Sequence, residues 1–204
     1  MRAGVKLFLA SSNPGKLGEY RAPADVSAAA EVCPEIALLP GFAAMPSFEE
    51  DAPTFAENAT GKALHYSRLA EGLVFADDSG LVVPALGGAP GVRSARYAGA
   101  KATDGERIAK LLGELRGKKG TERAAYFVCA IALAEQGRAI AVVTARVDGE
   151  ILEQARGGGG FGYDPVFYFP ALTKTLAEIS SEEKNLVSHR GKAFRKLIGT
   201  LGLS

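Results

Sequence analysis

The sequence predicts an α/β fold, and three observations support this class. Short apolar runs alternate with segments of helical pattern in the first half of the chain. Three apolar runs joined by turn residues follow in the second half. The chain has 204 residues, of which 47% are hydrophobic, so a large core can form without disulfide or metal crosslinks. We therefore expect residues 1–204 to fold as a single domain, in which early strand–helix units lead into a β-meander.

The first strand and helix flank a polar loop. Residues 5–10 form a short apolar run, and a helix is expected from about Lys16, after a loop of Ser, Asn, Pro and Gly. Gly18 weakens this helix, and Pro23 should break or kink it. Residues 35–39 are a candidate second strand.

A better-defined helix follows and leads into a buried strand. Thr54-Phe55-Ala56-Glu57 has the spacing of a capping box, so a helix should start near Thr54. It should run to about Glu71, with Gly72 as its C-terminal stop. Residues 73–76 are all apolar and predict a buried strand that ends abruptly at Asp77-Asp78-Ser79-Gly80.

The second half begins with a capped helix and continues as strands. Thr103-Asp104-Gly105-Glu106 again has capping-box spacing, and the apolar stripe of this helix consists of Ile108, Leu111, Leu112 and Leu115. Three successive strands are predicted over residues 124–133, 139–147 and 150–155, with turns at Gln136-Gly137 and Asp148-Gly149. The chain should close with a short strand over residues 166–169 and helices over residues 181–186 and 188–201.

The composition argues against a broad surface for nucleic acid or membranes. The 24 basic and 23 acidic residues leave a formal net charge of +1, which is still compatible with a local basic pocket. No apolar run is long enough to span a bilayer, and residues 1–6 lack the apolar core of a signal peptide. We therefore expect a cytoplasmic protein. Cys33 and Cys129 form no Cys-x-x-Cys pair, so zinc or dithiol chemistry has no ligand set.

The loop between the first strand and the first helix is a candidate phosphate site, made of Ser11, Ser12, Asn13, Pro14, Gly15 and Lys16. A small polar loop before a helix presents backbone N–H groups and the positive helix terminus to an anion, and Lys16 adds a positive charge. It is not a Walker A motif, because the first glycine is missing at its spacing and Leu17 follows the lysine. An ordinary helix-start turn is the alternative.

Two adjacent carboxylates at the end of a buried strand are a candidate metal site. In open α/β sheets, ligands bind at the edge where Asp77 and Asp78 are expected. The two carboxylates should repel each other by about 1 kcal/mol or more. Mg²⁺ held between them and a phosphate would offset this cost, whereas a simple polar turn is the alternative.

Two further residues near the second helix are candidates. Glu50, with its neighbours Glu49 and Asp51, could supply another metal ligand, although acidic residues just before a helix also favour its dipole. Lys62 lies on that helix, where a lone lysine is usually solvated.

The last third of the chain contains a candidate base site. Phe161-Gly162-Tyr163-Asp164-Pro165 follows four glycines, and its phenylalanine could either stack on a nucleobase or anchor the loop on the core. Stacking of this kind contributes about 1–3 kcal/mol. Lys184 and Ser188-His189-Arg190-Gly191 add three donors suited to phosphates or base edges, although His189 alone could be a surface histidine. A cation site, an anion loop, a stacking aromatic and base-reading donors together suit the cleavage of a nucleoside triphosphate.

These motifs resemble those of the inosine triphosphate pyrophosphatase family, which hydrolyses non-standard purine nucleotides such as dITP, ITP and XTP. The resemblance covers nearly the whole chain, and its blocks occur in the family's order. The first block is residues 9–16 together with Glu19, and the second is Glu50 followed by residues 54–59 and Lys62-Ala63. The remaining blocks are residues 76–81, 87–92, 94–97, 159–165 and 188–191.

The resemblance implies an elongated two-lobed fold, with a mixed sheet flanked by helices and the active site in the cleft between the lobes, usually in a homodimer. It also implies Mg²⁺-dependent hydrolysis between the α and β phosphates of a purine nucleoside triphosphate, which yields the monophosphate and pyrophosphate. Pro23 and Gly61 depart from the family pattern, but neither removes a site residue.

Roles follow from the matching positions. Asp78 is implied as the general base or water-orienting carboxylate, and Glu50 and Asp78 as metal ligands, with Asp77 close by. The phosphates would be held by Lys16, Asn13 and Lys62. The base would be covered by Phe161 and read by Asp164, Lys184, His189 and Arg190. The other substrate-binding candidates are Ser11, Ser12, Pro14, Gly15, Ser79, Gly162 and Tyr163.

Three alternatives remain at the level of sequence. The first is a house-cleaning pyrophosphatase that acts on other modified nucleotides, such as modified pyrimidines. The second is a nucleotide sensor without turnover, which the combination of Glu50, Asp78 and Lys16 disfavours. The third is a phosphotransferase with an aspartyl-phosphate intermediate, which the adjacent aspartates disfavour because such enzymes use Asp-x-Asp.

Overall fold

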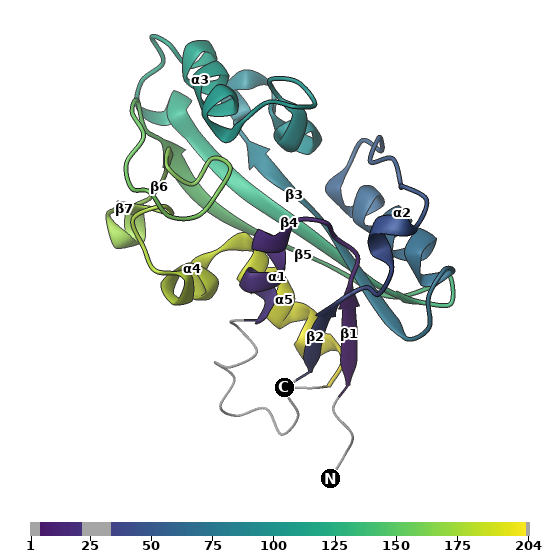
Figure 1. Ribbon diagram of the computed structural model, residues 1–204. Helices are drawn as coiled ribbons and strands as arrows, with labels where there is room; N and C mark the ends of the chain where they lie inside the picture. Colours follow the sequence, from purple (N-terminus) through teal and green to yellow (C-terminus); the bar gives the residue numbers. More distant parts are fainter. Residues whose placement is uncertain (1–4, 22–33, 203–204) are drawn as a thin grey trace.

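One mixed sheet forms the centre of the molecule (Figure 1). The computed structural model describes residues 5–21 and 34–202. Their strands form a seven-stranded sheet in the order β2-β1-β3-β4-β5-β6-β7. The strands are β1 (Lys6–Leu9), β2 (Glu35–Leu38), β3 (Leu73–Val82), β4 (Ala124–Glu135), β5 (Arg138–Ile151), β6 (Phe167–Phe169) and β7 (Lys174–Thr175). β1 is parallel to β2 and β3, and the other pairs are antiparallel, which confirms the α/β class with a mixed sheet.

Helices cover both faces of the sheet. The α-helices are α1 (Pro14–Arg21), α2 (Phe55–Ser67), α3 (Asp104–Glu114), α4 (Ser181–Val187) and α5 (His189–Thr200). Tyr20 of α1 and Phe194 of α5 pack with Phe75 in one buried cluster, whereas Ala63 of α2 packs with Ala76 on the opposite face. A third cluster joins Leu111 of α3 and Leu115, which follows that helix, to the far ends of β3, β4 and β5 and to β6.

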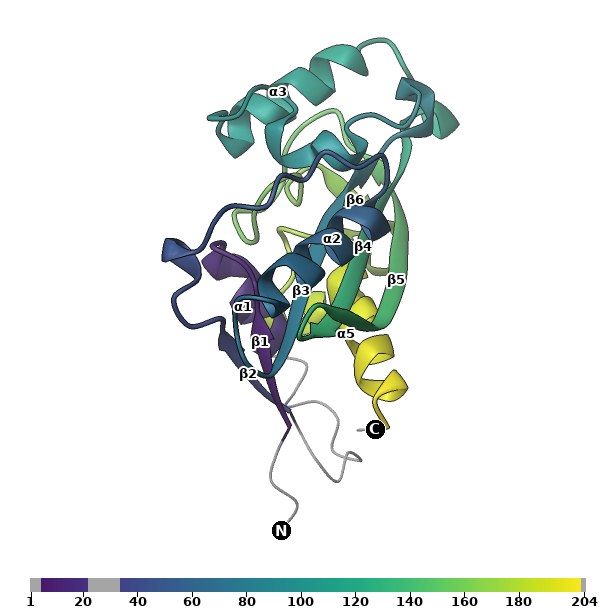
Figure 2. The same cartoon turned by 90° about the vertical axis from the view of Figure 1, so that its right-hand side faces the viewer.

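The long strands β3, β4 and β5 give the molecule its elongated shape (Figures 1 and 2). α3 lies at one end of these strands, and β1 and β2 lie at the other, so the predicted two-lobed form is confirmed. No helix of residues 5–21 and 34–202 has both the length and the hydrophobicity needed to cross a bilayer.

Capping residues begin the helices where the sequence predicts. Thr54 accepts a hydrogen bond from the Glu57 N–H at 3.2 Å, and Thr103 forms a complete capping box with Glu106. Ser188 caps α5 through the N–H of Gly191 at 3.1 Å. These caps satisfy N–H groups that have no partner within the helix.

The predicted end of β3 at the aspartates is wrong. β3 continues through Asp77, Asp78 and Ser79 to Val82, because β4 pairs with it over the whole length. Gly80 suits this strand because a Cβ there would overlap the Ser94 hydroxyl. The aspartates therefore lie within a strand, not on a turn.

The predicted turn at Asp148-Gly149 is also wrong. β5 runs through both residues, so two of the three predicted meander strands are one strand. Gly149 is needed there because a Cβ would overlap the Tyr168 carbonyl oxygen of β6. The turn at Gln136-Gly137 is confirmed, and both residues have positive φ, at 48° and 76°.

The two early helices differ from expectation in their ends. α2 ends at Ser67, before the predicted end at Glu71. At this end the Ser67 hydroxyl accepts a hydrogen bond from the N–H of Gly137, in the β4–β5 turn, at 3.0 Å. Gly61 within α2 leaves room for the ring of Phe48. α1 ends at Arg21, and the predicted break at Pro23 lies outside the described residues, as does Cys33.

Candidate active site

A cavity of about 460 Å³ opens beside the middle of β3. Segments far apart in the sequence form its walls: the start of α1, β3, the Gly160–Asp164 loop, the junction of α4 and α5, and the start of α3. Predicted site residues on the wall are Asn13, Gly15, Lys16, Glu50, Asp78, Ser79, Phe161, Gly162, Tyr163, Asp164, Lys184, His189 and Arg190. The fold thus brings most of the candidates into one space.

The Ser11–Lys16 loop is shaped by its own polar side chains. The side-chain oxygen of Asn13 accepts the N–H of Gly15 at 2.9 Å, and the Ser11 hydroxyl accepts the N–H of Asn13 at 3.1 Å. These bonds set the start of α1, where Asn13, Gly15 and Lys16 line the cavity. Ser11 is buried and Ser12 is exposed, and neither lines the cavity; Pro14 is the first residue of α1.

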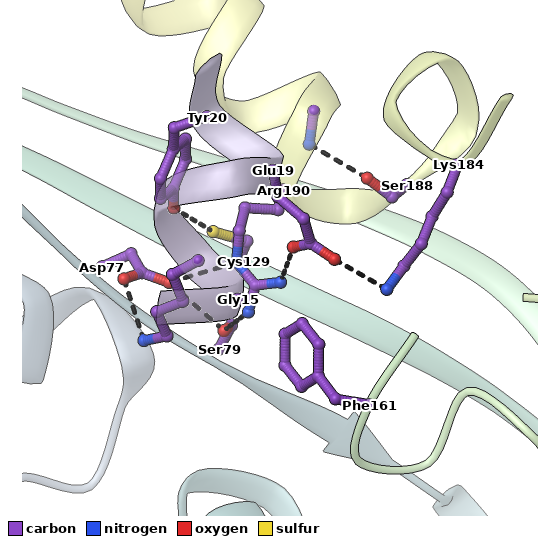
Figure 3. Close-up of polar contacts among 12 residues, drawn as sticks. Gly15, Glu19, Tyr20, Asp77, Ser79, Cys129, Phe161, Lys184, Ser188 and Arg190 are labelled. Carbon is purple, nitrogen blue, oxygen red and sulfur yellow. Dashed lines mark hydrogen bonds and ion pairs between the residues drawn. The ribbon is translucent and has the colours of Figure 1, made fainter. Parts of the chain in front are cut away.

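The two adjacent aspartates face opposite sides of the sheet, because side chains alternate along a strand. Asp77 is fully buried on the side of α1 and α5, where it pairs with Lys16 at 2.9 Å and Arg190 at 3.3 Å (Figure 3). Asp78 faces α2, where its Oδ2 accepts a hydrogen bond from Asn58 at 2.9 Å. One strand thus gives two carboxylates two different environments.

These environments move the two pKa values in opposite directions. Burial raises the pKa of Asp77, but the charges of Lys16 and Arg190 outweigh it and hold that pKa far below its usual value. Burial raises the pKa of Asp78 to about 6, and the negative charge of Glu50 adds to this in spite of the hydrogen bond from Asn58. Asp77 is therefore a fixed anion, whereas Asp78 titrates close to neutral pH.

Glu50 brings a second carboxylate to the cavity from the segment before α2. Its Oε1 lies 2.5 Å from the Nζ of Lys62, whose side chain is mostly buried. Burial lowers the pKa of Lys62, but the charges of Glu50, Asp77 and Asp78 and the hydrogen bond to Glu50 together outweigh it, and the net shift is upward. Lys62 is thus held against Glu50 at the edge of the site, and it is not part of the cavity wall.

Glu50 and Asp78 fit a hard divalent cation. No group of three or more His, Cys, Asp or Glu side chains in residues 5–21 and 34–202 could hold a metal by itself. Mg²⁺ needs no such cage, because it is commonly bound by one or two carboxylates, water and substrate phosphates. Burial is the main cause of the raised pKa of Asp78 and the charge of Glu50 adds to it, so a cation bound beside both carboxylates would favour the ionised form of Asp78. Asp77 has two cationic partners already and does not line the cavity.

A chain of ion pairs connects the two ends of the site (Figure 3). Arg190 bonds to Asp77, to the Ser79 hydroxyl at 2.7 Å and to Glu19. Glu19 also accepts from Lys184 at 2.6 Å, and Lys184 reaches Asp164 at 2.5 Å. Acidic and basic groups therefore alternate from Lys16 to Asp164, which holds the buried charges in place.

Phe161 lies where the loop after the glycines meets these charges. Asp164 accepts the N–H of Phe161 at 2.9 Å, and Asp104 accepts the N–H of Gly162 at 2.7 Å. The Lys184 ammonium lies 4.8 Å and the Arg190 guanidinium 5.4 Å from the Phe161 ring centre. Phe161 is partly exposed at the cavity, as a stacking aromatic requires.

Tyr163 and His189 are both buried. Tyr163 donates its hydroxyl to the Ser94 carbonyl oxygen at 2.9 Å and so fixes the loop to the core. The ring of His189 stacks on Phe127 with centres 4.6 Å apart and planes 9° from parallel. Burial lowers the pKa of His189 far below its usual value, helped by the charge of Arg190. The surface alternative for His189 is therefore wrong: it is a neutral ring in the cavity wall.

Comparison with known proteins assigns the family. The profile of the Ham1 family matches residues 7–200. The chain belongs to the Ham1 family. This confirms the family resemblance drawn from the motifs.

Curated and solved Ham1 relatives resemble this chain over nearly its full length. The dITP/XTP pyrophosphatase of Geobacillus kaustophilus is 51% identical over 94% of this chain and 92% of its own, and that of Thermus thermophilus is 46% identical over 97% and 92%. The structure of a HAM1 protein from Coxiella burnetii superposes with a TM-score of 0.84 at 40% identity, covering 98% of this chain and 100% of that one. The Staphylococcus aureus Ham1 protein gives 0.82 at 37% identity, covering 97% and 98%.

Several residues of this Ham1 site have no role in the sequence analysis. They are Asn58, Glu19, Ser94, Asp104, Arg107 and Phe127. Asn58 gave a signal, because a polar residue on the buried face of an amphipathic helix needs a partner. Phe127 gave none, because it follows the alternation of an ordinary core strand. Asp104 gave only a capping signal and Arg107 gave none, because their place near the cavity depends on the docking of α3.

Proposed function

We propose that this chain hydrolyses non-standard purine nucleoside triphosphates, such as dITP, ITP and XTP, to the monophosphate and pyrophosphate with Mg²⁺. The observation that carries the proposal is the arrangement of one cavity. One part of its wall has a helix start with Lys16 and the carboxylates of Glu50 and Asp78, and another has Phe161, Lys184 and His189. The names of the curated relatives support the same activity.

Asp78 is the group we assign to the attacking water. The new bond joins the water oxygen to the α phosphorus, the bond from that phosphorus to the bridging oxygen breaks, and pyrophosphate leaves in line. A pKa of about 6 keeps most Asp78 side chains ionised at neutral pH, so the carboxylate can orient the water and accept its proton.

The surrounding charges prepare the site for a triphosphate. Lys16 and Lys62 each carry a positive charge beside the carboxylates, and the positive end of the α1 dipole, which lines the same cavity, favours phosphate oxygens. Mg²⁺, held by Glu50 and Asp78, would neutralise negative charge on the phosphates. Asp77 acts on the chemistry only by holding Lys16 and Arg190 in place.

Base selection rests on the other part of the cavity. Phe161 would cover the purine ring, and donors from Lys184, His189 or Arg190 would meet the 6-keto oxygen of hypoxanthine or xanthine. Adenine has a 6-amino group there, so the same donors would be left unpaired against it. Guanine shares the 6-keto group, and its discrimination must involve the 2-position.

The cellular setting is a further part of this proposal. We assign the protein to the cytoplasm, as the sequence analysis expects, and to a homodimer, as the family resemblance implies. Light scattering after gel filtration tests the dimer: a mass near twice 21.2 kDa is expected, and a mass near 21.2 kDa would contradict it.

Steady-state hydrolysis of a nucleotide panel tests the function. ITP, XTP, dITP, GTP, ATP and modified pyrimidine triphosphates are compared with Mg²⁺, and pyrophosphate release is measured. The expected result is a kcat/KM for ITP, XTP and dITP at least about 100-fold above that for ATP, which is within the reach of hydrogen-bond discrimination. A preference for a modified pyrimidine would support a pyrophosphatase of other substrates, and no release from any nucleotide would contradict the proposal.

A further inference from the structure

Asn58 connects the two carboxylates at the cavity. Its side chain lies on α2 and is fully buried. The Oδ1 accepts the N–H of Ala52 at 2.9 Å, and the Nδ2 donates to the Ala52 carbonyl oxygen at 3.4 Å and to the Oδ2 of Asp78 at 2.9 Å. One amide therefore holds the segment that carries Glu50 and, at the same time, a carboxylate of β3.

This connection matters because Glu50 lies on a segment without regular secondary structure. Residues 45–54 run from the end of a short 3₁₀ helix to the cap of α2. The Tyr66 hydroxyl accepts the N–H of Phe48 at 3.2 Å, and Arg96 donates to the Glu50 carbonyl oxygen at 2.6 Å. Neither of these bonds touches Asp78, so Asn58 is the described side chain that joins the segment directly to β3.

The amide group suits this position better than its nearest substitutes. An aspartate at position 58 would place a third carboxylate near Asp78 and Glu50 and lose the donor to Asp78. A leucine of similar size would leave the N–H of Ala52 and the Oδ2 of Asp78 without this partner, and buried groups without partners are costly. With Oδ2 bonded to Asn58, the Oδ1 of Asp78 makes no hydrogen bond within residues 5–21 and 34–202.

We propose that Asn58 is a positioning residue that fixes the separation of Glu50 and Asp78 and turns one oxygen of Asp78 toward the cavity, so that both carboxylates can bind one divalent cation. The inference rests on the metal site of the proposed function. Such a residue orients a metal ligand without touching the metal. Its loss typically lowers metal affinity or activity by about 10–100-fold.

The test compares Asn58→Leu and Asn58→Ala with Tyr66→Phe in the full chain. Tyr66→Phe is the matched control, because it removes one hydrogen bond to the same segment and leaves Asp78 untouched. Two measurements are made without nucleotide: Mn²⁺ affinity by water-proton relaxation, and hydrogen exchange of the Ala52 and Phe48 amides. The Mg²⁺ concentration for half-maximal pyrophosphate release is measured separately, and thermal unfolding confirms that each variant is folded.

The Asn58 variants should bind Mn²⁺ about 10-fold or more weakly, need correspondingly more Mg²⁺ and exchange the Ala52 amide faster. Tyr66→Phe should exchange Phe48 faster and keep its Mn²⁺ affinity within about twofold of the wild type. Unchanged Mn²⁺ affinity in folded Asn58 variants, or an equal loss in Tyr66→Phe, would overturn the inference. If the wild type binds Mn²⁺ yet releases no pyrophosphate, the proposed function fails while the Mn²⁺ and exchange data still decide the role of Asn58.

Discussion

At the residue scale, Asp77 and Asp78 show how one step along a strand changes the chemistry of a side chain. Both are buried, but Asp77 meets two cations and Asp78 meets an amide and a neighbouring carboxylate. The sequence could predict that a pair of carboxylates lies near the site. It could not assign a different environment to each, because that depends on which helices cover each face of β3.

Replacement of each aspartate by asparagine should separate the two roles. Asp78→Asn should lower kcat by about 100-fold or more, because a positioned acid or base contributes about 10²–10⁴ in rate. Its stability should not fall, since burial disfavours the charged form of Asp78. Asp77→Asn should lower the free energy of unfolding by about 3 kcal/mol or more, because it leaves two buried cations without their shared anion.

Nucleotide hydrolysis and urea unfolding measure these two effects. Asp148→Asn is the control, since this exposed carboxylate of β5 pairs with Arg146 at the surface. Equal stability losses for the Asp77 and Asp78 variants, or a fully active Asp78 variant, would refute the assignment of separate roles.

His189 should make folding stability depend on pH. Its pKa is far below the value of about 6.5 expected in the unfolded chain. As pH falls below about 6.5, the unfolded chain takes up a proton that the buried ring cannot, so this residue's contribution to stability falls with pH. Between pH 7 and 5.5 the wild type should therefore lose about 1 kcal/mol more than His189→Phe, which keeps a ring on Phe127. Urea unfolding at both pH values measures the difference, and parallel losses in the two proteins would count against a neutral buried histidine.

At the element scale, local signals predicted where helices begin better than where strands end. The caps at Thr54, Thr103 and Ser188 act within a few residues, so the sequence shows them directly. Asp77-Asp78-Ser79-Gly80 and Asp148-Gly149 have turn composition but lie inside strands, because pairing with β4 overrides local preference. Glycine in these strands marks a close approach of a neighbour, which only the tertiary structure reveals.

Gly149 provides a direct test of this interpretation. Gly149→Ala should lower the free energy of unfolding by about 1–3 kcal/mol, because its Cβ would overlap the backbone of β6 and the ring of Phe167. Gly113→Ala is the matched control, since no atom lies within 4 Å of a Cβ at that position of α3. The control should be neutral or more stable by up to about 1 kcal/mol. Urea midpoints compare them, and equal stability of the two variants would disprove the close approach.

At the scale of the whole molecule, the site exists because distant segments meet at the middle of β3. The ion pairs from Lys16 through Arg190 to Lys184 join the first helix to the last two. The motifs predicted most of the members, since the family resemblance listed them in order. The connections between them could not be predicted, because they depend on the register of β3 and on the packing of α1 against α5.

Hydrolysis of ITP in ¹⁸O-labelled water with Mg²⁺ tests the central claim most directly, because it reports which phosphorus the water attacks. If water attacks the α phosphorus and the bond from that phosphorus to the α–β bridging oxygen breaks, each turnover yields inosine monophosphate with one ¹⁸O. Unlabelled pyrophosphate forms in equal amount. Label in the pyrophosphate, or formation of inosine diphosphate and inorganic phosphate, would contradict the account.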